Sequence, residues 1–343
     1  TLLARVSSAN TLIAPLIHAL FEGLSLFFGI SSMDTTAQVN HCARLVEQII
    51  DAKSLKTPQF SQLLMFVLEK INTRRSEGRH LFAGVYLLSI LIKHTKNKRQ
   101  MRVLNQHLSK IMTCVVSRVQ ALTTTDILQH HETIWCSTYG RTNKSIGELV
   151  VEVLSLIIAE RFRFSQIGPH HLGIAFQVIN AFSQTSSGEQ QGINSFSNGD
   201  GRSMLFGSQT ISKNLLCGFN QLLAQAVQKR IGSTLQTISQ FVLMVRFCIH
   251  SIFMIDYGKF KQRVEVVDEN YSVQDVVICV QTVARLFSVI GSRRHALKLR
   301  KYVGGLIEET LHCQIAMPMS QESKHVLRYG LFDLLNICSQ HEF

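Results

Sequence analysis

The C-terminal stretch RYGLFDLLNICSQHEF, residues 328–343, carries three side chains of the types found in nucleophilic active sites. Asp333, Cys338 and His341 could supply an orienting carboxylate, a thiolate nucleophile and a base. Helix geometry, however, turns Asp333 about 140° away from Cys338. One helical face instead contains Leu327, Leu331, Leu334, Leu335 and Cys338. Because burial raises a thiol's pKa and leaves it inert, we predict a core helix here and no catalytic residue.

Two other motifs resemble known sites but are incomplete. His131-Glu132-Thr133-Ile134-Trp135 begins like the zinc-protease motif, yet Trp135 stands where the second histidine ligand is needed. The glycine-rich run at 199–201 lacks the third glycine of a phosphate-binding loop. We therefore predict no metal and no cofactor. An enzyme with a new kind of helical site stays an alternative, which fast alkylation of Cys136 or Cys338 would favour.

The elements that would position these residues are predicted to be helices. Apolar residues recur at spacings of three and four along most of the chain, and no strand-like run is bounded by turn signals. Thr57-Pro58 predicts a helix start, since proline fits the first helical position. Its predicted core residues are Phe60, Leu63, Leu64, Val67, Leu68 and Ile71.

Further helices have clear signatures. The segment 80–94 is apolar nearly all round, which predicts a helix covered on several sides. Ser145 and Glu148 form a capping box that starts a helix through Glu160. The next stripe after 80–94 consists of Met101, Leu104, Leu108, Ile111, Met112, Val115 and Val119. Helices are also predicted over 169–182, 211–230, 233–256, 272–291, 293–314 and 320–340.

The composition breaks once, at residues 183–210, where Ser, Gly, Gln and Asn dominate. Such a segment cannot bury enough apolar surface to offset the entropy of ordering it. We expect a flexible insertion or linker between a helical array, 1–182, and a C-terminal helical region, 211–343; one continuous solenoid is the alternative. Short connections and abundant apolar surface predict stacked helical hairpins, an all-α, irregular α-solenoid of the HEAT or armadillo kind.

Composition narrows the partner classes. Of the 343 residues, 46% are hydrophobic and 17% charged, and the net charge of +12 favours nucleic acid or an acidic protein or lipid surface as partner.

The apolar stretch 15–30 carries His18 and Glu22 and is shorter than the roughly 20 residues of a membrane span, so we predict a buried helix and no membrane partner. Thr1 and the helical pattern running into Phe343 suggest a piece of a longer polypeptide.

Two basic clusters near helix ends are candidates for RNA contact, with an ordinary solvated surface as the alternative. The first consists of Lys93, Lys96, Lys98, Arg99 and Arg102. The second consists of Arg293, Arg294, Lys298, Arg300 and Lys301. Within it, the side chains at 294, 298 and 301 share one helical stripe, away from the predicted core face of Leu299, Val303 and Leu306.

The stretch GLIEETLHCQIAMPMSQESKHVLRYGLFDLLNICSQHEF, residues 305–343, resembles the C-terminal domain of the unhealthy ribosome biogenesis protein 2 family. The matching residues are Gly330, Leu331, Phe332, Leu334, Leu335 and Cys338. Tyr329 stands where the family usually has proline, and Asn336 where it has aspartate. The likeness covers 272–343 and extends faintly back to about residue 145.

The resemblance implies a function. Members of that family are nucleolar factors for large-subunit pre-ribosomal RNA processing, and they act in early pre-ribosomal particles beside other assembly factors, including a DEAD-box helicase. We therefore expect a non-enzymatic scaffold in the nucleolus that holds proteins and contacts pre-ribosomal RNA. The alternative is a general protein-interaction solenoid, such as a trafficking adaptor, outside the nucleolus.

Overall fold

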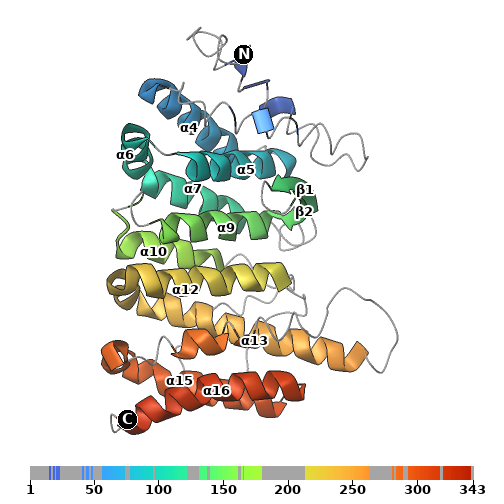
Figure 1. Cartoon of the computed structure of the whole chain (residues 1–343), viewed down its shortest axis with the longest axis vertical. Coiled ribbons are helices and arrows are strands. Elements are labelled where there is room, and N and C mark those ends of the chain that lie inside the picture. Colours follow the sequence, from blue (N-terminus) through green and yellow to red (C-terminus); the bar gives the residue numbers. More distant parts are fainter. Residues whose placement is uncertain are drawn as a thin grey trace. The chain divides into compact units, whose positions relative to one another are not determined.

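Figure 1 shows the computed structural model of the chain, in which most described residues are helical. The structure describes residues 56–73, 78–95, 97–121, 131–136, 140–160, 164, 166–179, 213–262, 280–281, 283–288, 293–316 and 320–340, with isolated positions within 15–23 and 41–48. The chain divides into two compact units, Thr1–Gln166 and Ile167–Phe343. The predicted linker at 183–210 lies outside the described residues, and α10, which the prediction places in the first array, groups with the second unit.

The first unit is built from helices and one hairpin. Its elements are α4 (Thr57–Asn72), α5 (Gly78–His94), α6 (Lys98–Gln106), α7 (Leu108–Gln120), β1 (His131–Cys136), β2 (Gly140–Ser145) and α9 (Ile146–Ala159). Helices α4 and α9 each pack against both α5 and α7, which encloses the core of this unit (Figure 1).

Helix α4 begins as predicted, with Pro58 in its first turn, and all six predicted core residues are buried. Helix α5 is covered on every side, because each residue from Leu81 to Ile92 is buried. The two helices approach closely at Gly84, where an added Cβ would lie 2.7 Å from Cγ1 of Ile71. Both predictions for these helices are therefore confirmed.

The helical turn near residue 21 packs on α4. Phe21 is wholly buried and meets the Phe66 ring edge-on at 5.6 Å, and the Lys70 ammonium lies 5.2 Å from the Phe21 ring centroid. Lys70 Nζ also donates to Glu22 Oε1 at 2.9 Å. The burial predicted for 15–30 thus applies to Phe21, whereas His18 is exposed. No helix among the described residues is both long and apolar enough to cross a membrane.

The stripe predicted from Met101 to Val119 is not one helix. Helix α6 ends at Gln106 and α7 starts at Leu108, with His107 at φ −101°, ψ 8° between them. The apolar spacing continues across the break, which is why the sequence pattern conceals it. Except for Met101, which is half-buried, the residues of the stripe are buried.

A two-stranded antiparallel hairpin corrects the prediction that the chain has no strand-like run. Strand β1 pairs with β2 so that His131 faces Ser145 and Cys136 faces Gly140. The run Thr133-Ile134-Trp135 has the β-branched and aromatic residues that favour strands. The chain then enters α9 through the predicted capping box: Ser145 Oγ accepts from Glu148 N at 3.2 Å, and Glu148 Oε2 accepts from Ser145 N.

The second unit is helical throughout its described part. Its elements are α10 (Pro169–Phe176), the 3₁₀ turn η1 (Gln177–Ile179), α12 (Lys213–Gln236), α13 (Ile238–Gln262), helical residues at 280–288, α15 (Arg293–Ala316) and α16 (Gln321–Gln340). Helix α12 packs on α13, α13 on α15 and α15 on α16. Edge-on ring pairs, Phe219 with Phe247 and Phe176 with Phe241, fill the core.

The break predicted between 230 and 233 is a kink within α12. Arg230 has non-helical angles, φ −133° and ψ 34°, yet the helix continues to Gln236. Thr234 Oγ1 donates to the carbonyl oxygens of Ala226 and Arg230, at 3.0 and 3.1 Å. This hydroxyl therefore bonds to carbonyl oxygens at the kink itself and one turn before it.

Helix α16 matches its predicted bounds within one residue at its start, and its buried face holds Leu327, Gly330, Leu331 and Leu334. The prediction that Leu335 belongs to the buried face is wrong, because its side chain is 48% exposed. It lies about 80° from Leu327 around the helix, at the edge of the apolar stripe. On the described residues the all-α fold class is confirmed apart from the hairpin.

Candidate functional site

The three reactive side chains at the C-terminus do not form a described site. Asp333 is exposed on α16, and the Cys338 side chain and His341 lie outside the described residues. The buried residues described on α16 are Ser323, Leu327, Gly330, Leu331 and Leu334, so the helix contributes to the core as predicted. The inertness of Cys338 stays a prediction.

Two thiols elsewhere in the described residues, Cys114 and Cys248, are buried in ways that suppress thiolate formation. Cys114 Sγ donates to the Leu68 carbonyl oxygen at 3.5 Å, and burial raises the pKa of this thiol to about 11, against the smaller opposing charges of Arg118 and Lys110. Burial likewise raises the pKa of Cys248. Thiols of this kind behave as small apolar side chains rather than nucleophiles.

The adjacent histidines His170 and His171 are candidate metal ligands. His170 and His171 lie with ring centroids 5.8 Å apart at the start of α10, and His171 Nδ1 accepts from Gly168 N at 3.2 Å. Burial, and then the charge of His170, lower the pKa of His171, which favours the neutral ring needed for that acceptor role. Within the described part of the chain, no three His, Cys, Asp or Glu side chains gather as metal ligands would.

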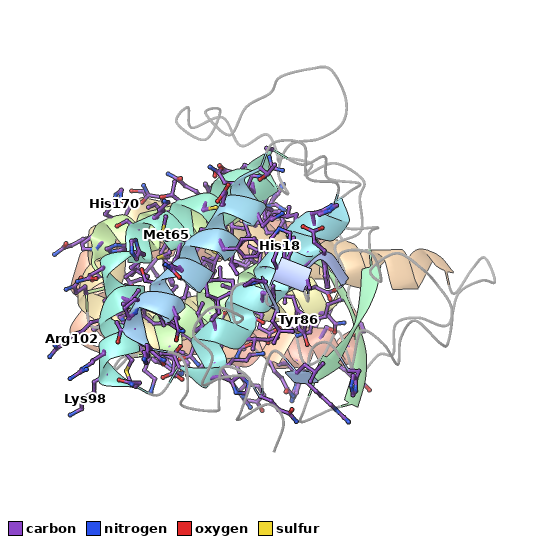
Figure 2. All side chains as sticks on the ribbon, turned by 90° about the horizontal axis from the view of Figure 1, so that it is seen from above. His18, Met65, Tyr86, Lys98, Arg102 and His170 are labelled. Carbon is purple, nitrogen blue, oxygen red and sulfur yellow. The ribbon has the colours of Figure 1, made fainter. Side chains whose placement is uncertain are left out.

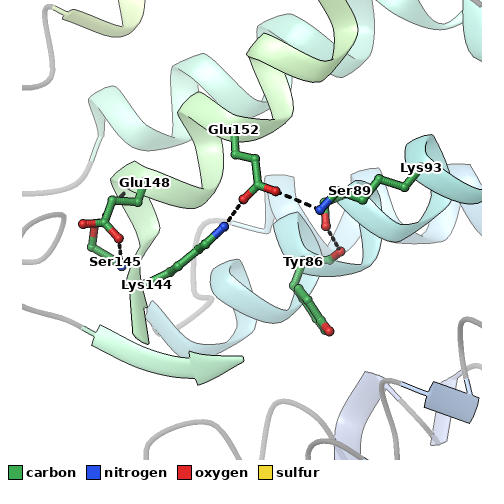
Figure 3. Close-up of polar contacts among 7 residues, drawn as sticks. All are labelled: Tyr86, Ser89, Lys93, Lys144, Ser145, Glu148 and Glu152. Carbon is green, nitrogen blue, oxygen red and sulfur yellow. Dashed lines mark hydrogen bonds and ion pairs between the residues drawn. The ribbon is translucent and has the colours of Figure 1, made fainter. Parts of the chain in front are cut away.

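The first basic cluster separates into a paired and an exposed part. Lys93, in the last turn of α5, donates to Glu152 Oε1 on α9 at 2.8 Å, and Lys144 at the end of β2 donates to Glu152 Oε2 (Figure 3). Burial alone would raise the pKa of Glu152, but the charges of the two lysines outweigh it and hold the pKa below its ordinary value. Lys93 is therefore engaged in tying α5 to α9.

The exposed part belongs to α6. Lys98, Arg99 and Arg102 are exposed, whereas Gln100, Val103 and Leu104 are buried, so α6 turns one face outward. Figure 2 shows Lys98 and Arg102 at the same edge of the ribbon, with their side chains extending outward. Lys96 lies outside the described residues.

The N-cap of α6 is Asn97, whose Oδ1 accepts from Arg99 N at 2.9 Å. Asn97 thereby satisfies one of the backbone donors at the helix start. Two cations, Lys98 and Arg99, follow directly at the positive end of the helix dipole, with no acidic residue in the first turn. Positive charge is therefore concentrated at this helix end.

The second basic cluster lies on α15, whose backbone contains Arg293, Arg294, Lys298, Arg300 and Lys301. Val303 and Leu306 are buried as predicted, while the side chains of Leu299 and of the five cations lie outside the described residues. The helical spacing that places three of these cations on one stripe is confirmed by the continuous helix, but their exposure is not described.

Sequence reasoning missed a partly buried ionic group between α13 and α15. Arg246 Nε and His250 Nε2 both donate to the carboxylate of Glu309. Burial alone would raise the pKa of Glu309, but the hydrogen bonds from His250 and then Arg246 outweigh it and lower the pKa. The one local sequence signal for this group is the four-residue spacing of Arg246 and His250, which places both on one helix face.

A row of exposed apolar side chains was also missed. On α16, Tyr329, Phe332 and Leu335 are 65%, 60% and 48% exposed, and on α15 Leu311 and Ile315 are exposed as well. The residues on which the sequence resemblance rests lie on both sides of the helix: Gly330, Leu331 and Leu334 are buried, and Phe332 and Leu335 are exposed. No protein-family model, curated protein or solved structure matches this chain.

Proposed function

We propose that this chain is a non-enzymatic scaffold in large ribosomal subunit biogenesis, acting in early nucleolar pre-ribosomal particles beside other assembly factors. Its helices would form an irregular α-solenoid of stacked hairpins. Three features support the proposal: helices successive in the chain pack as neighbours within the second unit, the chain carries a net charge of +12, and residues 305–343 resemble the family described above.

The exposed apolar row on α16 is the observation that carries the proposal. Tyr329, Phe332 and Leu335 recur at three-residue spacing and place two aromatic rings and one leucine on the outer helix face. Interface cores are enriched in aromatic residues, and contiguous exposed apolar surface marks interaction sites. Because Gly330, Leu331 and Leu334 hold the opposite face in the core, the row is presented on a packed helix rather than on a loop.

Affinity isolation of the full-length protein tests this function. The tagged parent should recover large-subunit precursor RNA and other assembly factors. The double variant Phe332→Ser and Leu335→Ser should lose the assembly factors while keeping its fold, because exposed substitutions usually change stability by less than about 0.5 kcal/mol.

A matched control uses the polar neighbours on the same helix face. Asp333→Ser and Asn336→Ser change exposed residues of α16 without removing apolar surface, and should leave recovery at the parent level. Equal recovery by the parent and the Phe332/Leu335 variant would remove this row as the binding surface. Recovery of trafficking or transport proteins in place of precursor RNA would favour the adaptor alternative.

A further inference from the structure

Helix α6 lies within a long segment of the sequence that contains no acidic residue. From Gly78 to Thr125 the chain contains no Asp or Glu. Its exposed cations in the described part include Lys98, Arg99 and Arg102 on α6 and Lys110 on α7. None of these four pairs with an acidic side chain of any described residue.

Four other cations of the described residues form ion pairs, unlike those of α6. Lys70 pairs with Glu22, Lys93 and Lys144 with Glu152, and Arg246 with Glu309. Ion pairs of that kind hold helices together. The cations of α6 contribute no such contact, and two of them stand at the positive end of the helix, where like charge is unfavourable. A polyanionic ligand would relieve that repulsion.

The chemistry of the surroundings favours nucleic acid over a folded acidic protein. Protein interfaces generally contain a core of large apolar side chains, whereas nucleic-acid interfaces are more polar and more positive. The large apolar side chains that are exposed in the described residues all lie on α15 and α16, in the second unit, and none on α6 or α7. The outer face of α6 offers charge and hydrogen-bond donors alone.

We infer that the outer face of α6, with Lys98, Arg99 and Arg102, binds the phosphodiester backbone of RNA. Lys110 on α7 is a further exposed cation of the same acid-free segment. Lys93 is excluded from the surface because it is bound to Glu152. The inference names a partner class for the scaffold and in that sense rests on the proposed function, although RNA binding is measurable on the purified protein alone.

The test compares two charge-matched triple variants of the full chain. The test variant carries Lys98→Gln, Arg99→Gln and Arg102→Gln. The control carries Lys229→Gln, Arg285→Gln and Arg328→Gln, which are exposed cations of the second unit and lower the net charge equally. Fluorescence anisotropy with a labelled homopolymeric RNA is recorded over a salt series, and circular dichroism checks that helicity and melting are unchanged.

Each phosphate contact on a single strand contributes about 0.7 to the slope of log affinity against log salt. Loss of three contacts should therefore flatten the slope by about 2 and weaken binding about 100-fold at ~0.1 M salt, by the same factor for every RNA sequence. The control variant should stay close to the parent.

Two results would overturn the inference. One is an unchanged slope and affinity in the test variant; the other is equal loss in both variants, which would mean that only net charge matters. Poly-glutamate of matched charge serves as a competitor: displacement of RNA at equal concentration would identify an acidic-protein surface instead. If the inference about α6 fails but the full-length protein still recovers precursor particles, the proposed function stands. If the protein binds RNA through α6 but recovers no precursor particles, only the proposed function is refuted.

Discussion

Gly330 of α16 lies directly against Ala284 of the helical residues 283–288. A Cβ atom added at Gly330 would be 2.7 Å from Ala284 Cα and 3.0 Å from its carbonyl oxygen. Such distances are shorter than any ordinary carbon contact, and the obstacle is backbone rather than a movable side chain. The absence of a side chain at 330 therefore permits the two helices to pack this closely.

Replacing Gly330 should destabilise the protein. Alanine gains about 1 kcal/mol of helix propensity, but overpacking costs about 1–3 kcal/mol, so Gly330→Ala should lose up to about 2 kcal/mol and Gly330→Leu more. Denaturant unfolding measures both. Gly304→Ala on α15 is the matched control, since nothing lies within 4 Å of its added Cβ, and it should gain stability. Equal gains at both positions would show that Gly330 is not a packing residue.

The carboxylate of Glu309 should stabilise the second unit in a pH-dependent way. Glu309→Gln removes the carboxylate to which Arg246 and His250 both donate, and should cost about 1–3 kcal/mol at neutral pH. Because the folded pKa of Glu309 lies below its ordinary value of 4.5, this stabilisation is present above that pH and disappears as the pH falls through the folded pKa. Thermal melts of both proteins across acidic pH should converge; a constant difference would contradict the ionic role.

Thiol labelling should find no activated cysteine. At a pKa of about 11, only about one Cys114 in ten thousand is a thiolate at neutral pH, so alkylation of the native protein should be slow and should accelerate on unfolding. We expect Cys338 to be slow as well. A rate typical of a free thiolate at Cys136 or Cys338 would instead favour the enzyme alternative.

The basic stripe of α15 provides a separate test of RNA contact. Reversing Arg294, Lys298 and Lys301 to Glu should leave the helix folded, since the buried Val303 and Leu306 are untouched. Binding should weaken about equally for any RNA and the salt slope should flatten, by about 0.7 per lost contact. If the triple variant binds like the parent at matched salt and helicity, this stripe is an ordinary solvated surface.

The sequence predicted helices best where one local signal decides the outcome. The proline of α4, the capping box of Ser145 and Glu148, and the all-apolar α5 all lie where expected. The prediction failed where one sequence pattern is compatible with more than one structure. The α6–α7 break at His107 keeps the apolar spacing, and Leu335 lies at the margin of a stripe, where burial depends on the neighbouring helix rather than on periodicity.

The site features that escaped prediction depend on contacts distant in the sequence. Glu309 lies 63 residues from Arg246, so no local spacing could pair them. Lys93 was grouped with its basic neighbours because Glu152, its partner, is 59 residues away. Net charge and periodicity identify basic clusters, but only packing decides which cations are already neutralised.

Sedimentation of nuclear extract through a density gradient tests the central claim most directly. The full-length protein should migrate with early large-subunit precursor particles, identified by their precursor RNA, and should shift to the top of the gradient after ribonuclease treatment. Migration apart from every precursor particle, in extract where those particles are intact, would contradict a role in large-subunit assembly.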